Sequence, residues 1–543
     1  MKRLILIAGV GVLLSCATPE PREQHYLRTD GHNIVDAEGN RVFLRAVGLG
    51  NWLLPEGYMW KFGRDGDRPR KIEALIQQLI GEENANAFWE SFRRYYITEA
   101  DIARIKELGF NTVRPAMNWR LFMDEDTGDF QQEGFDLIDN LVEWCQVHEV
   151  YIILEMHAAP GGQTGANIDD SANNFPELFT NDTYQEWFVD LWVEFAKRYR
   201  DEPIIIAYDL LNEPLPNEFN IYFDRLEPLY KRTVAAIRQV DEHHMITLEG
   251  AHWSTDFSIF GPPFDDNVFY QFHKYWSLPD TKSIQQYIAF RNAHDVPLFL
   301  GESGENDLDW YWAAYDLFEN HNIGWLFWPW KKMDTENTPY SIQKPEDWDK
   351  IADFSRGGPQ PDAETAQRIL DQFLENIKLQ NCEFFPEVVN AIFRRVPVRI
   401  QAEHYGHLGS GTSFSVQDTT FRAEDYRINE PVPIVTLEPD TTDNWRRDSS
   451  KYAVVLNEGE WLQYEIHSTK DQILKLLVKV RARSENPAMH FELDGEPLEL
   501  SRNYSQKQFY YNHSNPITIT QGQHDLRLVV DCGSVVVDWF DIK

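Results

Sequence analysis

The sequence has few cysteines and no recognisable metal-binding cysteine motif. Four cysteines occur among 543 residues, widely scattered and without a Cys-x-x-Cys pair. This pattern argues against both a disulfide framework and a structural zinc site. Near the N-terminus, the apolar run at 4–14 is too short to span a bilayer. The length instead predicts two or three folded units, and apolar residues at 42% are sufficient for their cores.

Basic residues are also scarce. The 51 lysines and arginines face 87 acidic residues, which gives a net charge of −36 at pH 7. Such a charge repels phosphate backbones, so nucleic acid is excluded as a partner. A neutral polymer is indifferent to it. Aromatic residues, by contrast, are plentiful at 14% with 18 tryptophans, which suits stacking on the apolar faces of sugars but also large aromatic cores.

The first residues have the character of an export signal. Met1-Lys-Arg precedes the apolar run, and Leu13-Leu-Ser-Cys16 resembles the bacterial lipobox, in which the cysteine is lipidated. We therefore predict a lipoprotein signal at 1–16, a tether at 17–24 and an exported lipoprotein at the outer membrane or cell surface. The lipid would attach the protein to the membrane without spanning it. The alternative is an ordinary secretory signal with an incidental cysteine.

Short apolar runs alternate with helical patterns over 25–395. The alternation predicts a (β/α)8 barrel, a fold whose active site lies at the C-terminal ends of the strands. A hairpin turning at Glu38-Gly39-Asn40 is expected to cover the barrel floor. The predicted barrel strands are Ala46 to Trp52, Thr112 to Pro115, Val150 to Met156, Ile204 to Leu211, Met245 to Glu249, Val268 to Phe272, Pro297 to Gly301 and Gly324 to Trp328.

Two glutamates end predicted strands in the same way. Glu213 follows Ile206-Ala-Tyr-Asp-Leu-Leu-Asn, and Glu302 follows Pro297-Leu-Phe-Leu-Gly. A single rim glutamate is commonly a solvated or ion-paired residue. A pair on one rim supplies what cleavage of a glycosidic bond requires, one acid to protonate the leaving oxygen and one carboxylate to meet the sugar carbon.

Further polar and aromatic residues end the other strands. The predicted rim carries Arg114, His157, His273-Lys-Tyr275 and Trp328. A single buried His or Trp is more often a satisfied core residue, but the same rim position recurs on strand after strand, which chance rarely produces.

These motifs resemble glycoside hydrolase family 5. The resemblance implies that Glu213 is the acid/base and Glu302 the nucleophile of a retaining hydrolase that needs no cofactor. It also implies that Arg114 and Tyr275 bind the nucleophile, that His157, Asn212 and His273 contact the sugar, and that Trp328 forms the floor. Val47-Gly-Leu-Gly-Asn-Trp-Leu and His157-Ala-Ala-Pro-Gly-Gly-Gln are similar to the exo-acting β-1,3-glucanase subset, where Glu56 would bind sugar. The Trp-Pro-Trp-Lys-Lys-Met segment and the Trp60-Lys-Phe-Gly loop depart from it, which leaves linkage specificity open.

The segment 396–543 alternates short strands with turns and predicts a β-sandwich. Its segments Ile400-Gln-Ala-Glu-His-Tyr, Asn457-Glu-Gly-Glu-Trp-Leu-Gln-Tyr464 and Val537-Asp-Trp-Phe540 resemble a family 6 carbohydrate-binding module. The resemblance implies a possible structural calcium held by Glu403 and Asp538, with Gln401 in place of a further carboxylate. The candidate sugar-stacking residues are Trp445, Trp461, Tyr464, Tyr510 and Tyr511.

Together these features predict a monomeric, retaining β-glucanase acting on β-1,3 or β-1,4 bonds of a polysaccharide or oligosaccharide. Two alternatives stay open. One is another retaining β-glycosidase on the same scaffold, such as a mannanase, xylanase or glycosylceramidase. The other is a surface glycan-binding protein without activity, although the presence of both glutamates argues against it.

Overall fold

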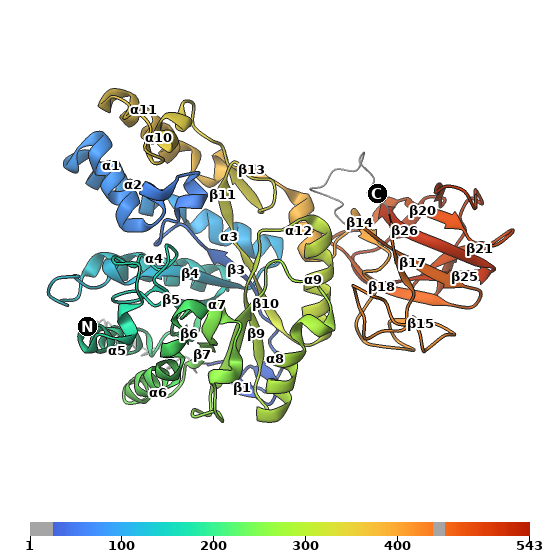
Figure 1. The fold of residues 1–543 in the computed structure, drawn as a ribbon, viewed down its shortest axis with the longest axis horizontal. Coiled ribbons are helices and arrows are strands. Elements are labelled where there is room, and N and C mark those ends of the chain that lie inside the picture. Colours follow the sequence, from blue (N-terminus) through green and yellow to red (C-terminus); the bar gives the residue numbers. More distant parts are fainter. Residues whose placement is uncertain (1–24, 438–450) are drawn as a thin grey trace, which may run out of the picture.

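The computed structural model describes residues 25–437 and 451–543, and it divides into an α/β barrel and an all-β unit (Figure 1). Eight parallel strands close the barrel in the order β10-β3-β4-β5-β6-β7-β8-β9. The predicted (β/α)8 fold is therefore confirmed, and every predicted strand overlaps one that is observed. The barrel strands are β3 (Arg45–Leu49), β4 (Thr112–Asn118), β5 (Tyr151–Ala158), β6 (Ile205–Asp209), β7 (Met245–Glu249), β8 (Val268–His273), β9 (Leu298–Gly304) and β10 (Gly324–Trp328).

Helices surround the strands. Most of them bury one apolar face on the parallel sheet and expose the other face to solvent, whereas the helix at Leu308–Asn320 is buried on all its faces. The caps follow the sequence: Thr98 and Asp101 form a reciprocal capping box at the start of α3, and Gly109 ends that helix with φ +102°. The barrel helices are α3 (Glu99–Leu108), α4 (Gln132–His148), α5 (Asp182–Tyr199), α6 (Leu226–Ile237), α8 (Thr281–His294), α9 (Leu308–Asn320) and α12 (Pro386–Ile392).

Two local predictions differ from the structure. Between β7 and β8 the expected helix is reduced to the four-residue α7 (Ala251–Ser254), since Gly261-Pro-Pro interrupts the segment and proline cannot continue a helix. The turn at Glu38-Gly39-Asn40 forms, but its strands pair only through a bridge between Val35 and Arg41. The hairpin in this region is instead β1 (Arg28–Asp30) with β2 (Asn33–Val35).

Insertions after β3 and β10 build up the catalytic end of the barrel, because both leave from the C-terminal ends of their strands. They pack on one another: Trp60 contacts Trp89 and Phe92 of the first insertion and Trp348 and Phe373 of the second. The inserted elements are α1 (Pro69–Ile80), α2 (Glu82–Tyr96), β11 (Lys331–Met333), β12 (Tyr340–Ile342), α10 (Trp348–Phe354), α11 (Ala363–Asn376) and β13 (Glu383–Phe384). The 3-10 segments are η1 (Gly57–Trp60), η2 (Arg64–Gly66), η3 (Trp119–Leu121), η4 (Glu177–Phe179), η5 (Asn217–Arg225), η6 (Phe257–Ile259) and η7 (Leu379–Asn381).

The C-terminal unit consists of two antiparallel sheets packed face to face, which confirms the predicted β-sandwich. Strand β18 shows the reason, because its residues alternate between buried and half-buried along its whole length. One sheet has the order β16-β17-β26-β20-β23 with β14 beside β26, the other β15-β18-β25-β21-β22, and β19 pairs with β24. The strands are β14 (Val398–Gln401), β15 (Phe414–Ser415), β16 (Ile434–Thr436), β17 (Tyr452–Asn457), β18 (Trp461–Ser468), β19 (Gln472–Leu474), β20 (Leu476–Ala482), β21 (Ala488–Leu493), β22 (Glu496–Leu498), β23 (Tyr510–His513), β24 (Ile517–Ile519), β25 (Gly522–Cys532) and β26 (Ser534–Ile542).

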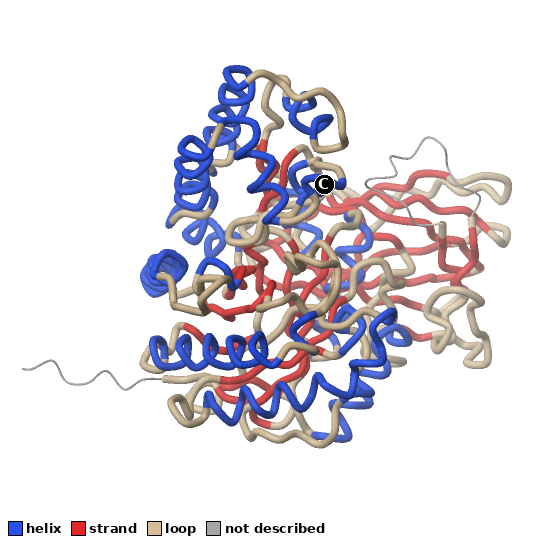
Figure 2. Tube along the Cα trace, turned by 60° about the vertical axis from the view of Figure 1, so that its left-hand side comes forward, coloured by secondary structure: helices blue, strands red, loops and turns tan. Residues whose placement is uncertain are grey.

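The sandwich lies against the side of the barrel that carries α9 (Figure 1), and the turned view also shows the strand-rich sandwich beside the barrel (Figure 2). Trp312 of α9 is buried in the apolar core of the sandwich. Arg394, between the two units, donates to Glu319 of α9 at 2.7 Å and to Glu465 of β18 at 2.9 Å. The contact therefore joins an apolar anchor to a buried ion-pair network. Within the described ranges, no helix combines the length and apolar character needed to cross a membrane.

Candidate active site

Glu213 lies in a strained turn just beyond β6. Its φ is +46° and that of Leu215 is +49°, a region that residues other than glycine rarely adopt. Such conformations cost on the order of 1–3 kcal/mol each and persist only where the surroundings impose them. Here the Glu213 N–H donates to Glu249 Oε2 at 2.6 Å, and the Asn212 N–H donates to the carbonyl of Met156 at 3.0 Å. The turn is thus fixed by neighbouring strands rather than by its own preference.

Glu302 is held within β9 by two strong donors. Arg114 Nη1 donates to its Oε1 at 2.7 Å, and the Tyr275 hydroxyl donates to its Oε2 at 2.6 Å. Burial raises the pKa of Glu302, and the positive charges of His273 and Arg114 oppose that rise. The preceding residue is constrained as well, because a Cβ at Gly301 would lie 1.9 Å from Gln271 Oε1.

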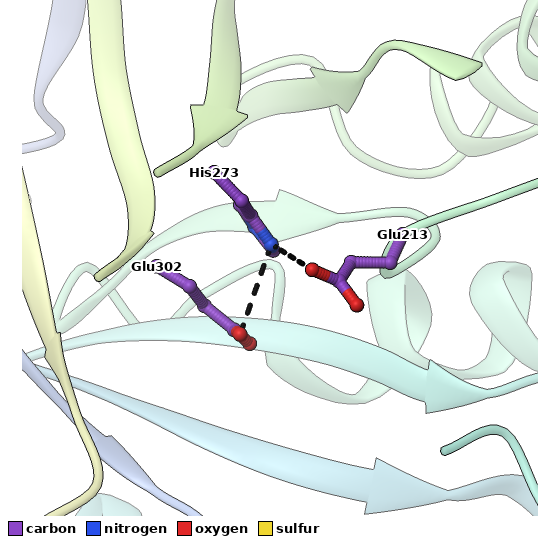
Figure 3. Close-up of side chains that lie close together, drawn as sticks. All are labelled: Glu213, His273 and Glu302. Carbon is purple, nitrogen blue, oxygen red and sulfur yellow. Dashed lines mark hydrogen bonds and ion pairs between the residues drawn. The ribbon is translucent and has the colours of Figure 1, made fainter. Parts of the chain in front are cut away.

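The two glutamates face each other across His273 (Figure 3). His273 Nδ1 lies 2.8 Å from Glu213 Oε1 and 3.7 Å from Glu302 Oε2. A carboxylate oxygen of Glu213 lies within 4.8 Å of one of Glu302. This close spacing matches retaining glycosidases, whose carboxyl groups are about 5–5.5 Å apart, whereas inverting enzymes need roughly 6.5–9.5 Å to admit a water molecule.

Glu213, His273 and Glu302 are also the one group in the described chain with ligand atoms close enough together to hold a metal ion. The charge state of His273 disfavours this use. Although burial lowers the pKa of His273, the negative charges of Glu249 and Glu302 raise it well above its ordinary value. A protonated imidazole donates from both nitrogens and has no lone pair for a metal. The trio is therefore suited to proton transfer.

Arg114 is fully buried and is surrounded by acidic side chains. Besides Glu302, it contacts Asp209 at 2.7 Å, Glu249 at 2.9 Å and Glu155 at 3.5 Å. Burial raises the pKa of Asp209 to about 7 despite the arginine, so this carboxyl group is neutral for part of the time at neutral pH. The rim prediction for Arg114 is confirmed in position. The acidic side chains around Arg114 were not predicted from the sequence. The sequence does contain a signal for them, because each of three apolar strands carries one acid: Glu155, Asp209 or Glu249.

His157, Asn212 and Trp328 line the same end of the barrel. His157 Nδ1 lies 2.6 Å from Glu155 Oε1, and the His157 ring stacks on Trp328 with centroids 5.5 Å apart. Burial lowers the pKa of His157, but Glu155 raises it to about 9 overall. Asn212 accepts a hydrogen bond from Arg114 at 3.1 Å. The structure thus brings together all the barrel residues expected at the site.

A pocket of about 380 Å³ opens over these side chains. Glu56 lines it, as the sequence predicted, and burial raises the pKa of Glu56 to about 8, so its carboxyl is protonated at neutral pH. Four lining residues were not predicted, because they come from loops that only the fold brings together. They are Tyr58, Ile168, Trp276 and Glu305. Trp276, 78% exposed, offers an indole face at the opening.

The predicted calcium site in the sandwich has a different chemistry. Glu403 and Asp538 are buried, but Lys479 Nζ lies 3.0 Å from Asp538 Oδ2, and the Gln401 amide donates to Asp309 of the barrel at 3.1 Å. An ammonium group next to Asp538 competes with a cation, and no described His, Cys, Asp or Glu completes a cluster with these two carboxylates. The described residues therefore fit calcium poorly.

The predicted sugar-stacking aromatics of the sandwich separate into two groups. Tyr464 is buried in the core and its hydroxyl donates to the carbonyl of Ala402, so its expected stacking role is wrong. Tyr510 and Tyr511 are exposed and Trp461 is half-buried. Trp445, like Cys16, lies outside the described residues.

Two family models match the chain. Residues 76–334 match Cellulase (glycosyl hydrolase family 5), and 422–543 match Carbohydrate binding module (family 6). Curated proteins similar to the chain include three enzymes. A "Beta-xylosidase" of Phanerodontia chrysosporium is 36% identical over 46% of this chain and 52% of its own length. An "Endoglucanase C" of Acetivibrio thermocellus is 27% identical over 44% of this chain and 86% of its own length. A "Glucan 1,3-beta-glucosidase" of Candida oleophila is 27% identical over 47% of this chain and 60% of its own length.

The chain thus spans about half the length of the β-xylosidase it matches. The two family matches fall on the two units of the fold, and the first contains Arg114, Glu213 and Glu302. The barrel is therefore similar to glycosyl hydrolase family 5, and the C-terminal unit is similar to a family 6 carbohydrate-binding module.

Proposed function

We propose that the protein is a retaining β-glucan hydrolase that removes single sugars from chain ends. The observation that carries this proposal is a set of three linked side chains at the catalytic pocket, on the side away from Glu213. The coarser assignment, hydrolysis of β-glucans, is supported by the family match and by relatives that act on glucans.

The reaction is a double displacement. Glu302 attacks the anomeric carbon as Glu213 gives its proton to the departing oxygen, and the glycosidic bond breaks to leave a sugar ester on Glu302. Glu213 then removes a proton from water, which releases the sugar with its original configuration. Arg114 and Tyr275 donate to Glu302 throughout, so they also stabilise this carboxylate as it leaves in the second step.

The order of the strands gives the substrate its direction. Glu213 follows β6, which lies four strands away from β10 around the barrel in either direction. Because the acid must reach the leaving oxygen, the leaving group lies towards β6. The sugar that is cleaved off then extends towards β9, β10 and β3.

Three linked side chains, which we call the Tyr58–Glu305–Lys332 wall, lie on that side, and we expect them to block the pocket there. The Tyr58 hydroxyl accepts from Trp328 Nε1 at 3.1 Å and donates to Glu305 at 3.3 Å. Lys332 forms an ion pair with the other oxygen of Glu305. A separate pocket of about 660 Å³ lies beyond and shares Glu305. A sugar chain would have to pass through the wall to continue, so we expect room for one residue.

Product analysis tests this proposal directly. Laminarin and cellohexaose should yield monosaccharide from the first time point, without intermediate oligosaccharides. Y58A should open the wall and release disaccharide as well. Oligosaccharides of mixed length from the unmutated enzyme at early times would contradict exo action.

A xyloside is a second candidate substrate, because the most similar relative named here is a β-xylosidase at 36% identity. Comparing kcat/KM for 4-nitrophenyl β-glucoside and β-xyloside decides between them. We expect the glucoside to be preferred at least tenfold, and a preference for the xyloside would replace the glucan assignment.

We further propose that the protein is anchored to a bacterial outer membrane or cell surface through a lipid on Cys16, and that the module holds the enzyme on polysaccharide. The lipobox-like segment supports the first statement and the family 6 match supports the second. C16S should move activity from the membrane pellet to the soluble fraction, and unchanged attachment would contradict the anchor.

A further inference from the structure

We propose that Glu249 is a positioning residue, which holds the strained turn of Glu213 so that the acid is aimed at the glycosidic oxygen. Glu249 ends β7, next to the strand that leads to Glu213, and it is completely buried. Neither of the catalytic steps above requires it to touch the sugar. The inference rests on the proposed glycosidase function.

The contacts of Glu249 join the two halves of the catalytic pair. Its Oε2 accepts the Glu213 N–H at 2.6 Å. Its Oε1 accepts from Arg114 Nη2 at 2.9 Å and lies 3.4 Å from His273 Nε2. Arg114 holds Glu302, and His273 contacts the Glu213 carboxyl. One side chain therefore fixes the backbone of the acid and two groups that contact the catalytic oxygens.

The hydrogen bond to the Glu213 N–H is the contact that gives Glu249 its role. Glu213 has φ +46°, and relaxation of this turn would rotate the peptide and swing the carboxyl away from its present place. A charged acceptor makes a stronger bond to a backbone N–H than a neutral one. Burial raises the pKa of Glu249, but His273, Arg114 and the Glu213 N–H together lower it below its ordinary value, which keeps this acceptor ionised.

Glu155 provides a matched control. It is equally buried and also contacts Arg114, at 3.5 Å, but its second ion pair is with His157 at 2.6 Å rather than with the Glu213 backbone. Shortening either glutamate to aspartate keeps the charge near Arg114. Only E249D moves the carboxylate out of hydrogen-bond distance of the Glu213 N–H.

The experiment compares kcat/KM for two β-glucosides in the full-length enzyme. Cleavage of the glycosidic bond in 2,4-dinitrophenyl β-glucoside needs no proton from an acid, because dinitrophenolate is a good leaving group. Cleavage of a glucan oligosaccharide needs that proton. We expect E249D to lower kcat/KM for the oligosaccharide by about 10- to 100-fold, part of the roughly 10²–10⁴-fold value of general acid catalysis. On the dinitrophenyl substrate kcat/KM should fall less than about threefold. E155D should lower kcat/KM by the same factor on both substrates.

E249Q gives an independent check, because it keeps the length and one acceptor oxygen but loses the charge. Its ratio of kcat/KM between the two substrates should fall by less than in E249D, because a neutral oxygen still accepts the Glu213 N–H but more weakly than a carboxylate. Equal losses on both substrates in E249D, or a ratio that falls as far in E249Q as in E249D, would overturn the positioning role. Lack of activity on both substrates in the unmutated enzyme would instead contradict the proposed function.

Discussion

The two sides of the catalytic pocket hold their carboxylates in different ways. On the β9 side, Glu302 sits within a regular strand and accepts from an arginine and a tyrosine. On the β6 side, Glu213 sits in a strained turn, its side chain is 15% exposed, and its carboxylate contacts His273. A nucleophile must stay ionised and still, whereas an acid/base must gain and lose a proton. The difference in support thus matches the two roles.

Loss of the nucleophile should have the largest effect. E302A removes the group that forms the ester, so kcat/KM should fall on the order of 10⁴-fold or more on every substrate, whatever its leaving group. Steady-state assays with laminarin oligosaccharides and dinitrophenyl glucoside measure this. A loss confined to poor leaving groups would move the acid role to Glu302.

Loss of the acid should be large only where a proton is needed. E213A should lower kcat/KM by about 10²–10⁴-fold on oligosaccharides and far less on dinitrophenyl glucoside. Rates plotted against leaving-group pKa should fall steeply for the variant and little for the unmutated enzyme. Parallel lines would contradict the assignment.

The hydrogen-bond donors to Glu302 should contribute equally to kcat/KM for every leaving group. Y275F removes a 2.6 Å hydrogen bond to Glu302, and a bond to a charged group is worth about 1.5–3 kcal/mol, roughly 10- to 100-fold in rate. The loss should be equal for good and poor leaving groups, because it affects the nucleophile. A leaving-group-dependent loss would link Tyr275 to the acid instead.

Replacing Glu56 should change kcat/KM less than replacing Tyr275, and the change should depend on pH. Its pKa of about 8 lies above the ordinary carboxyl value, so it is a neutral donor below pH 8 and an anion above it. The anion would add negative charge near Glu302, and kcat/KM should therefore decline as the pH rises through 8. E56Q stays neutral and should lose that decline. An unchanged profile would contradict it.

Removal of the sandwich should affect stability more than chemistry. A barrel ending at Phe393 exposes Trp312 and deprives Glu319 of Arg394, so its melting temperature should fall by several degrees. On soluble aryl glucosides its kcat/KM should stay within about twofold, because the contact lies away from the pocket. A larger kinetic loss would mean that the two units share the site.

Much of this arrangement follows from the sequence. Apolar runs locate the barrel strands, and the residues that end them reach one rim because parallel strands share a direction. Glu155, Asp209 and Glu249 were visible as acids inside apolar strands, and a buried acid requires a partner such as Arg114. Helix α9 is buried on all its faces, which was a signal that a second unit covers it. The Tyr58–Glu305 contact spans 247 residues, and no local pattern encodes it.

The configuration of azide products tests the roles of the two glutamates most directly. In E213A, azide should enter the space left by the acid/base and attack the ester on Glu302, which gives the β-glucosyl azide. In E302A, azide should replace the nucleophile, so any product should be the α-azide. Proton NMR distinguishes the two by the coupling of the anomeric proton. An α-azide from E213A would contradict the account, as would an α-configured first product from the unmutated enzyme.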